Sequence, residues 1–470
     1  MAYINGQWLE TSEQESVYNP ATGEVIASVS IVGANETKEA IQAASESFKT
    51  WRKLPGATRG AYMAKAVEIM RSRAEELANT ITQENGKPLA DAKGEVTSGI
   101  NYLEWYAEEA KRVYGDVVPA SHEDKHLMVL RQPVGVAAAI TPWNFPFSMI
   151  TRKIAPALAA GCTVVLKPAP ATPLSAINVF ECFHEAGVPA GVVNLVIGDA
   201  EAIGKEMTSS TDVRKLTFTG STAVGKMLMR DSAATMKRMS MELGGHAPFI
   251  VFEDADLEAA ANGVLMSKFR NAGQTCISTN RVYVQQSVVT EFGDILARKV
   301  SELTVGEGTK EGVDVGPLIN DNAVQKVNEH VQDACSKGGK VLSGGNIIER
   351  NGNFFEPTVI QGATDTMRIA TEETFGPVAP IFSFETTEEV IERANNSRYG
   401  LAGYCFTNDL SRAYEVMNEL EYGIVGINDP TPITVQAPFG GMKESGTGKE
   451  GGKYGLDDYL IEKFVSIKTN

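Results

Sequence analysis

One cysteine of this chain lies in a segment that could do chemistry. Cys276 stands in NAGQTCIS, an amide-rich, glycine-containing run typical of a loop. Main-chain N–H groups in such a loop could lower the pKa of the thiol and make Cys276 a nucleophile. Free cysteines are, however, often inert side chains of a core. The segment alone leaves both interpretations open, with the inert cysteine as the more frequent case.

Two other polar residues suit roles beside a nucleophile. Glu242, in MSMELGGHAP, ends an apolar run, where burial would raise the pKa of its carboxyl toward that of a useful general base. The alternative is a buried ion pair. Asn144, in AITPWNFPFSMITRK, follows a predicted strand, and its amide could donate to a developing oxyanion. The alternative is a loop residue that caps the next helix.

Two more segments could hold a nucleotide. In KLTFTGSTAVGKMLM a strand leads into Gly220-Ser221 and then a helix with Gly225 in its first turns, whose N-terminal amides could bind a phosphate. In VVLKPAPATP, Lys167 ends a predicted parallel strand, where open α/β sheets bind ligands. The ordinary alternatives are a capped strand–helix turn and a solvated lysine.

The elements that must position these residues alternate along the chain. Apolar residues at three- and four-residue spacing predict amphipathic helices over 37–53, 58–85 and 96–115. From residue 128, short β-branched runs separated by helical segments indicate a parallel sheet covered on both faces, and a second such set begins after residue 245. The chain at 115–132 and the last stretch, LIEKFVSIKTN, are predicted edge strands, to which another subunit could add its own.

Composition narrows the class of protein. A chain of 470 residues suggests about three structural units. Its formal net charge of −16 without a basic block argues against nucleic-acid binding. We expect no membrane association, because the most apolar stretch, 154–166, is shorter than the roughly 20 residues that a bilayer requires, and no signal peptide is visible. Five scattered cysteines predict a reducing cytoplasm, and five histidines form no zinc motif, so no metal is expected.

Taken in order, seven segments give the chain a family resemblance. TPWNFP, LKPAPATP, FTGSTAVG, ELGG, NAGQTC, EETFGPV and NDPTPITVQAPFGGMKESG resemble motifs of the aldehyde dehydrogenase superfamily along essentially the whole chain. RNAGQTC, MITRK and GKEGGKYGLDDYL are most similar to its succinate-semialdehyde dehydrogenase branch. The resemblance implies NAD(P)-dependent oxidation of an aldehyde to a carboxylic acid through a cysteine thiohemiacetal and a thioester.

The fold implied by the resemblance has three parts. A Rossmann-like, parallel-sheet dinucleotide-binding domain of α/β class would comprise residues 1–114 and 133–243, and an α/β catalytic domain residues 244–443. Residues 115–132 and 444–470 would form a small β extension for oligomerisation. Dimers or tetramers built through the edge strands are expected.

The resemblance also assigns roles to single residues. Cys276 would be the nucleophile, the Asn144 amide with the Cys276 backbone N–H would stabilise the oxyanion, and Glu242 would activate the water that hydrolyses the thioester. Glu373 and Phe375 would hold the nicotinamide ribose and ring. Residues implied at the rest of the dinucleotide are Trp143, Lys167, Pro170, Gly220, Ser221, Gly225 and Leu243.

Two positions depart from relatives in the family. NAD-preferring members often have a Glu three residues after the lysine, where it binds the adenosine ribose. A carboxylate there would repel the 2′-phosphate of NADP. In this chain the position is Pro170, so NADP should be tolerated, and use of NAD stays open. Some semialdehyde enzymes have a second cysteine two residues after the nucleophile. Ser278 stands there, so that redox disulfide is absent.

The predicted substrate is a small aldehyde with a distal acid group, such as succinate semialdehyde. Arg152 and Arg270 match positions that bind this carboxylate in the semialdehyde branch, with structural ion pairs as the alternative. The family serine that shares this task is replaced in DPTPITVQ, where Ile433 and Thr434 lie at the matching position. Glutarate semialdehyde, a sulfonated aldehyde and a small hydroxyaldehyde therefore stay open as substrates.

Two rivals belong to other classes of protein. A cofactor-free cysteine hydrolase or acyltransferase could use the same cysteine and oxyanion donor, but the segments resembling a dinucleotide site argue against it. A non-enzymatic protein that reuses the fold would be expected to have lost part of Cys276, Glu242 and Asn144, and all three are present.

Overall fold

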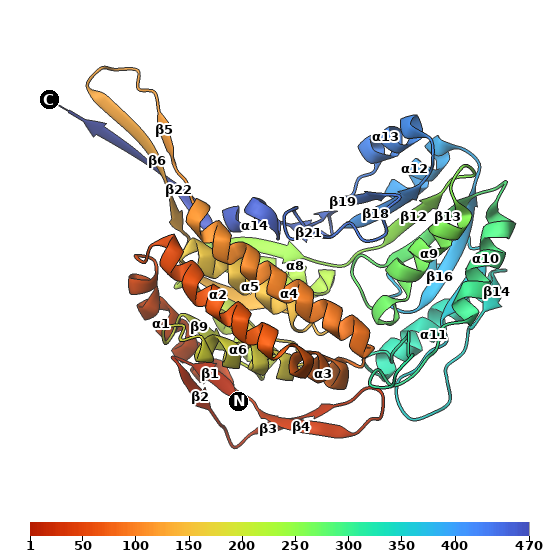
Figure 1. Cartoon of the computed structure of the whole chain (residues 1–470), viewed down its shortest axis with the longest axis horizontal. Helices are drawn as coiled ribbons and strands as arrows, with labels where there is room; N and C mark the ends of the chain where they lie inside the picture. The colour runs from red at the N-terminus through yellow and green to blue at the C-terminus, as the bar shows by residue number, and fades with distance from the viewer. Residues whose placement is uncertain (470) are drawn as a thin grey trace.

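The computed structural model describes residues 1–469 as two lobes, each built around its own β-sheet, with a narrow arm that extends from one end (Figure 1). The first lobe holds an eight-stranded sheet of order β2-β1-β9-β8-β7-β10-β11-β21. Its central five strands are parallel and its edges antiparallel. The strands are β1 (Ala2–Ile4), β2 (Gln7–Leu9), β7 (Val136–Ile140), β8 (Thr163–Lys167), β9 (Val193–Leu195), β10 (Val213–Thr219), β11 (Arg238–Glu242) and β21 (Gly446–Thr447).

Alternating side chains of the parallel strands bury themselves on opposite faces of this sheet. In β8, Val164 and Leu166 join a core on one face, whereas Val165 joins a second core on the other. Helices cover both faces, as nearly continuous apolar strands require. These helices are α1 (Ala34–Trp51), α2 (Gly56–Ser72), α3 (Ala74–Asn85), α4 (Leu89–Glu109), α5 (Ser148–Ala160), α6 (Leu174–Glu185), α7 (Ala200–Ser209) and α8 (Thr222–Ser232).

The second lobe repeats the α/β plan around its own core. Its seven-stranded sheet has the order β14-β15-β16-β13-β12-β18-β19 and is parallel except for β14. Its strands are β12 (Ala247–Val251), β13 (Thr279–Gln285), β14 (Lys340–Ser343), β15 (Thr358–Gln361), β16 (Val378–Phe384), β18 (Ala402–Phe406) and β19 (Ile424–Ile427). Its helices are α9 (Leu257–Lys268), α10 (Val289–Ser301), α11 (Asp321–Ser336), α12 (Thr387–Asn395) and α13 (Leu410–Glu419).

The arm is a three-stranded antiparallel sheet of order β22-β6-β5. It consists of β5 (Asp116–Val118), β6 (Lys125–Pro133) and β22 (Leu460–Lys468). Within the predicted segment 444–470, only β22 lies in this sheet. β21 pairs with β11 of the first lobe, and α14 (Gly452–Asp457) packs against α4 and α5.

The remaining elements are short. They are β3 (Gln14–Tyr18), β4 (Val25–Ser30), β17 (Tyr399–Gly400), β20 (Met442–Lys443), η1 (Ala110–Arg112), η2 (Ala233–Thr235), η3 (Arg270–Gly273) and η4 (Arg368–Ala370).

The predicted α/β fold with parallel sheets is confirmed. One predicted helix is wrong in its continuity: residues 58–85 form α2 and α3, which are separated at Arg73. Arg73 has φ −102° and ψ 11°, outside the helical range, and its guanidinium bonds Glu76 and Glu181. In the portion that the structure covers, no helix combines the length and the apolar character that a membrane crossing demands.

Candidate active site

The carboxyl ends of neighbouring parallel strands meet at one edge of the first sheet. The order β8-β7-β10-β11 places Lys167, the loop after β7, Gly220 and Glu242 along this edge. β8 follows β7 on one side, whereas β10 and β11 are added on the other. The crevice between β7 and β10 is therefore a topological switch point, where open α/β sheets bind ligands.

Cys276 lies in the second lobe, on the loop between α9 and β13. This loop is strained, since Asn271 and Ala272 have φ angles of 49° and 54°, a left-handed region that residues other than glycine rarely adopt. The Asn271 N–H donates to Asp91 Oδ2 at 3.1 Å, and Asn271 Nδ2 donates to the Asn144 carbonyl at 3.0 Å. Both acceptors belong to the first lobe, so the loop is tied across the junction of the lobes.

Asn144 lies beside the loop that carries Cys276. It is buried between β7 and α5, and its Nδ2 donates to the carbonyl of Gln274 at 3.0 Å. An amide NH2 has two hydrogens, so this bond leaves the second one unused. The alternative role as a cap of α5 is wrong, because Phe147 occupies the N-cap position and no side-chain cap bond forms there.

Glu242 ends β11 and is buried. Neither of its carboxylate oxygens finds a hydrogen-bond partner among residues 1–469, and it makes no ion pair with them, so the alternative of a buried ion pair is not observed. Burial, and next the neighbouring Glu450, raise the pKa of Glu242 well above its ordinary value, against Lys153 and Arg152. A carboxylate of this kind is a strong proton acceptor once deprotonated.

The pKa of the Cys276 thiol differs from the predicted direction. Burial raises its pKa to about 12, and Glu373, Glu242 and Glu450 act in the same direction, whereas Arg152 lowers it. The prediction that loop amides lower this pKa is therefore wrong for this arrangement. The cost of desolvating the thiolate outweighs the attraction of the Arg152 guanidinium.

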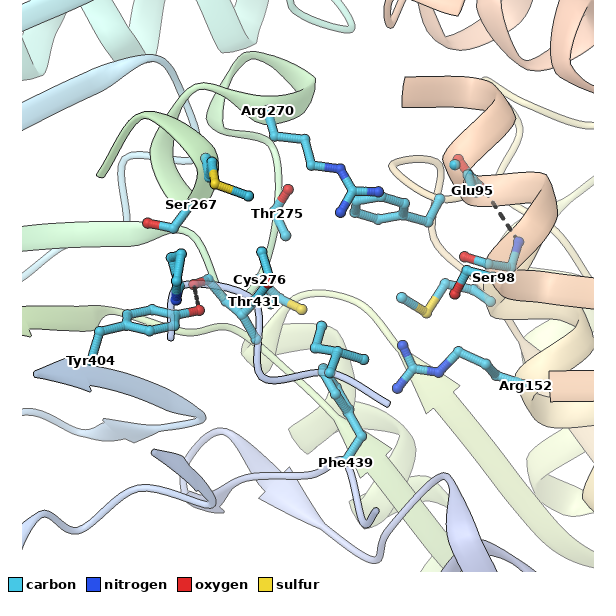
Figure 2. A pocket seen from close by; sticks show the side chains of 18 residues that line it. Glu95, Ser98, Arg152, Ser267, Arg270, Thr275, Cys276, Tyr404, Thr431 and Phe439 are labelled. Atoms are coloured by element: carbon cyan, nitrogen blue, oxygen red, sulfur yellow. Dashed lines mark hydrogen bonds between the residues drawn. The ribbon is translucent and has the colours of Figure 1, made fainter. Parts of the chain in front are cut away.

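A cavity of about 370 Å³ opens in front of Cys276, with walls from both lobes. Figure 2 shows the Cys276 sulfur facing the space into which the Arg152 and Arg270 side chains also extend. The lining residues are Gly94, Glu95, Ser98, Phe145, Ser148, Met149, Arg152, Met266, Ser267, Arg270, Thr275, Cys276, Ile277, Tyr404, Pro430, Thr431, Ile433 and Phe439.

Arg152 combines an ion pair with free donors. Its Nε lies 3.1 Å from Glu450 Oε2, and its guanidinium sits 4.1 Å from the Phe439 ring centre and 5.1 Å from that of Tyr102. Arg152 is almost fully buried, yet in the described part of the chain neither Nε nor Nη2 has a hydrogen-bond acceptor of suitable geometry. A buried guanidinium with unused donors suits an incoming anion.

Arg270 lies at the more open side of the cavity. Its side chain is 43% exposed, its Nε is 3.9 Å from Asp91 Oδ1, and it approaches the Phe145 ring at 5.7 Å. This loose pairing in a solvated position leaves the guanidinium largely available.

Of the two residues expected at the matching position in the loop before Phe439, Ile433 lines the cavity and Thr434 does not. Thr431 and Ile433 line the cavity, whereas Thr434 is absent from its walls and donates instead to Gln436. The turn at Asp429, whose carboxylate accepts from the Thr431 N–H at 2.8 Å, orients this loop. No local sequence pattern distinguishes Thr431 from Thr434, because the turn alone decides which side chain points inward.

Sequence reasoning missed a buried charge cluster behind Glu242. Lys153 Nζ donates to Glu450 Oε1 at 2.7 Å and to Thr217 at 3.1 Å, so Glu450 lies between Lys153 and Arg152. Lys153 lies in the motif MITRK and Glu450 in GKEGGK. Because 297 residues separate them, no sequence pattern predicts that they meet.

The predicted dinucleotide residues follow the strand ends. Lys167 is buried, and its ammonium donates to the Pro168 carbonyl at 3.1 Å, while Pro170 is exposed. Ser221 caps α8 through Val224, at 3.4 Å. The hydroxyls of Thr141 and Thr219 on the same edge are buried without a hydrogen-bond partner among residues 1–469. A cation, a helix N-terminus and unpaired hydroxyls together fit a phosphate-bearing cofactor.

Gly225 and Leu243 lie against each other. A Cβ on Gly225 would stand 2.5 Å from Leu243 Cδ2, so glycine lets α8 pack closely on the end of β11. The two predicted cofactor residues thereby set the position of the helix N-terminus.

The nicotinamide end of the predicted site is also assembled. Glu373 Oε1 accepts from the Gly245 N–H at 3.0 Å, and burial raises the pKa of Glu373 to about 7. The rings of Trp143 and Phe375 meet edge to face at 5.7 Å, with Phe375 held at φ 53°. An aromatic wall beside a carboxylate fits a nicotinamide riboside.

No set of three or more His, Cys, Asp or Glu side chains within residues 1–469 is arranged to hold a metal ion. All five cysteines, which lie in this range, are unpaired.

Comparison with known protein families gives a match to the aldehyde dehydrogenase family over residues 8–465. The chain is 52% identical to a glutarate-semialdehyde dehydrogenase of Pseudomonas putida strain KT2440, over 100% of this chain and 98% of that protein. It is 51% identical to the NADP(+) succinate-semialdehyde dehydrogenase GabD of Escherichia coli K12, over 99% and 97%. A crystal structure of succinate-semialdehyde dehydrogenase from Burkholderia pseudomallei superposes with a TM-score of 0.99 at 48% identity, covering 100% and 98% of the two chains. The chain belongs to the aldehyde dehydrogenase family.

Proposed function

We propose that this aldehyde dehydrogenase oxidises a short semialdehyde to the corresponding dicarboxylate, with NADP or NAD as the oxidant. One observation carries the proposal: two arginines line the cavity in front of Cys276, and the buried Arg152, whose Nε pairs with Glu450, has an Nη2 with no hydrogen-bond acceptor among residues 1–469. A hydrocarbon aldehyde would leave this donor unsatisfied, whereas a distal carboxylate would accept from both guanidiniums. The names of the two relatives described above agree with this substrate class.

The first chemical step is attack by Cys276 on the aldehyde carbon. The ionised form of Glu242 takes the thiol proton, the sulfur–carbon bond forms, and the carbonyl oxygen becomes an oxyanion that accepts hydrogen bonds from the Asn144 amide and the Cys276 N–H. A nicotinamide, when bound, would accept the hydride of the adduct's C–H bond as the oxyanion re-forms the C=O double bond, and Cys276 would then carry a thioester.

The second step is hydrolysis of the thioester. After its proton has left to solvent, Glu242 takes a proton from a water molecule, whose oxygen attacks the thioester carbon. The carbon–sulfur bond breaks, the dicarboxylate leaves, and the sulfur recovers a proton. The same carboxylate therefore serves both halves of the reaction.

The residues that would hold the cofactor are Trp143, Lys167, Gly220, Ser221, Glu373 and Phe375. Pro170 places no carboxylate beside the adenosine ribose, which supports use of NADP without excluding NAD. The GabD relative is named as NADP(+)-dependent.

The arginines are tested by substitution against a panel of aldehydes. We expect Arg270→Ala to raise KM for succinate semialdehyde and glutarate semialdehyde about 10- to 100-fold, as a lost charge-assisted hydrogen bond of about 1.5–3 kcal/mol predicts. KM for propanal should change less than about twofold. Initial rates with NAD and with NADP are measured in the same assays.

The matched control is Arg298→Ala. Arg298 is an exposed residue of α10 whose Nη2 lies 2.8 Å from Glu258 Oε1. Equal losses for propanal and for the semialdehydes in Arg270→Ala would contradict anion recognition by this residue. Strict use of NAD would contradict the inference from Pro170.

The arm is proposed as the surface for assembly into a dimer or tetramer, since β5 is an edge strand and its residues are exposed. Unpaired cysteines are consistent with a cytoplasmic location, which is proposed on that ground.

A further inference from the structure

A fully buried ion pair lies behind the loop that carries Asn144. Lys87 Nζ is 2.6 Å from Glu95 Oε2, and both side chains are 0% exposed. Lys87 stands between α3 and α4, and Glu95 lies in the second turn of α4. Because desolvation offsets most of the attraction in such a pair, it is a weak source of stability. The other contacts of Lys87 and Glu95 indicate a role other than stabilising the fold.

Both members of the pair hold the loop between β7 and α5. Lys87 Nζ donates to the Asn144 carbonyl at 2.7 Å and lies 4.1 Å from the centre of the Phe145 ring. Glu95 Oε1 accepts from the N–H groups of Phe147 at 2.9 Å and Ser148 at 3.1 Å. Glu95 is labelled in Figure 2, where a dashed line marks a hydrogen bond of this residue. Glu95 thus supplies from α4 the acceptor that α5 lacks at its own N-terminus.

The same carbonyl connects the pair to the thiol loop. The Asn144 carbonyl accepts from Asn271 Nδ2 as well as from Lys87, and Asn144 Nδ2 donates to the Gln274 carbonyl. Two donors on one carbonyl fix the peptide plane and hence the direction in which the Asn144 side chain leaves the backbone. The two loops that must meet at an oxyanion are thereby fixed relative to each other.

We propose that Lys87 and Glu95 are positioning residues that keep the Asn144 amide aligned with the oxyanion at Cys276. The proposal rests on the role proposed above for Asn144. Both Glu95 oxygens are already engaged by Lys87 and by the α5 amides, so Glu95 acts through the loop although it borders the cavity. A displacement of about 1 Å at an oxyanion donor can cost roughly 100-fold in rate.

The test compares Glu95→Gln and Lys87→Met with a control on the same helix. Lys93→Met breaks the exposed pair of Lys93 with Glu75, at 2.9 Å, and should leave the kinetics unchanged. We expect Glu95→Gln and Lys87→Met to lower kcat for succinate semialdehyde about 10- to 100-fold. KM for NADP and the rate of Cys276 alkylation by iodoacetamide should change less than about twofold.

A double-mutant cycle with Asn144→Ala separates positioning from general support. If Glu95 acts through Asn144, Glu95→Gln should cost almost nothing further in the Asn144→Ala background. Additive losses would overturn the proposal, and so would wild-type kcat in both Glu95→Gln and Lys87→Met. A proportional loss of kcat, cofactor affinity and thiol alkylation would show a general structural role and would also overturn it.

A double variant and the Asn144→Ala variant keep the outcome decisive. Lys87→Met combined with Glu95→Leu removes both charges without leaving one unpaired, so it should fold even where a single variant does not. Its kcat should fall as in the single variants, and wild-type kcat in this folded variant, verified by circular dichroism, would overturn the proposal. Wild-type kcat in Asn144→Ala alone would instead refute the role proposed for Asn144.

Discussion

At the scale of single residues, burial favours the protonated forms of the Cys276 thiol and of the Glu242 carboxyl. Burial raises the pKa of Cys276 to about 12 and that of Glu242 well above its ordinary value, and each carboxylate near the thiol adds to the effect. With this pKa, the sulfur of Cys276 is a thiol and not a thiolate before it attacks a substrate. In the proposed mechanism the proton leaves Cys276 as the sulfur–carbon bond forms, and the ionised Glu242 carboxylate acts in both chemical steps.

This predicts an alkaline pH dependence. A raised pKa means that the proton-accepting form becomes populated as pH rises, so kcat/KM for succinate semialdehyde should rise from pH 6 to pH 9, by at most about tenfold per pH unit for one proton. Steady-state rates with NADP at constant ionic strength measure the profile. A profile that falls over this range would contradict the assigned protonation states.

Glu242→Gln serves as the matched comparison. This variant should release at most about one equivalent of reduced cofactor, more slowly than the wild type because the proton acceptor of the first step is also lost, and then stall at the thioester. Full turnover at the wild-type rate would show that another group activates the water.

At the scale of elements, the connection from β11 to β12 brings the two lobes into contact at the site. The Gly245 N–H holds the Glu373 carboxylate, and a Cβ on Gly245 would stand 2.1 Å from the Cys276 carbonyl. The segment that follows Phe439 closes this region, since β21 pairs with β11 and the Ser445 hydroxyl donates to the Gly244 carbonyl at 2.7 Å. One short connection therefore fixes Glu242, Glu373 and Cys276 relative to one another.

Substitution of Gly245 by alanine should damage this arrangement. The added methyl group must displace a backbone carbonyl, so we expect a loss of roughly 1–3 kcal/mol in the free energy of unfolding and at least a tenfold fall in kcat. Gly204→Ala is the control, because Gly204 lies within α7 and a Cβ there meets no atom within 4 Å. That change should raise stability by up to about 1 kcal/mol. Equal thermal midpoints for the two variants in calorimetry would refute the steric argument.

At the scale of the whole molecule, the arm is the part that the two lobes leave exposed. β22 pairs with β6 along its full length, from Leu460 opposite Pro133 to Lys468 opposite Lys125, yet Val117 and Phe464 are 84% and 64% exposed. An exposed edge with large apolar side chains is the surface expected of a subunit contact.

Phe464→Glu should therefore weaken assembly. A buried charge without a partner opposes association, so the variant should dissociate to smaller species at concentrations at which the unmodified protein stays assembled. Light scattering after gel filtration measures the mass. Leu410→Glu, at a 72% exposed site on α13, is the control and should leave the mass unchanged. An unaltered mass for Phe464→Glu would place the contact elsewhere.

The sequence predicted the fold class because the parallel strands carry their own signal. TVVLK and VAAAI are apolar on both faces, and only a sheet covered on both sides satisfies such strands. It did not predict the break at Arg73, since the apolar period continues through it and contacts with a distant helix decide it. It also placed Thr434 rather than Thr431 at the cavity, because side-chain direction in an irregular loop depends on the turn at Asp429.

For the site, the motifs alone determined which residues could take part: a cysteine in a glycine-containing loop, a glutamate at a strand end and an asparagine after a strand. The tertiary structure decided their meeting, because Asn144 reaches the carbonyl of Gln274 across 130 residues of sequence. It also decided how burial shifts the pKa of Cys276 and which loop atoms Lys87 and Glu95 contact. Residue identity is encoded locally, whereas burial and electrostatics depend on every chain segment packed around a group, and only the folded chain brings those segments together.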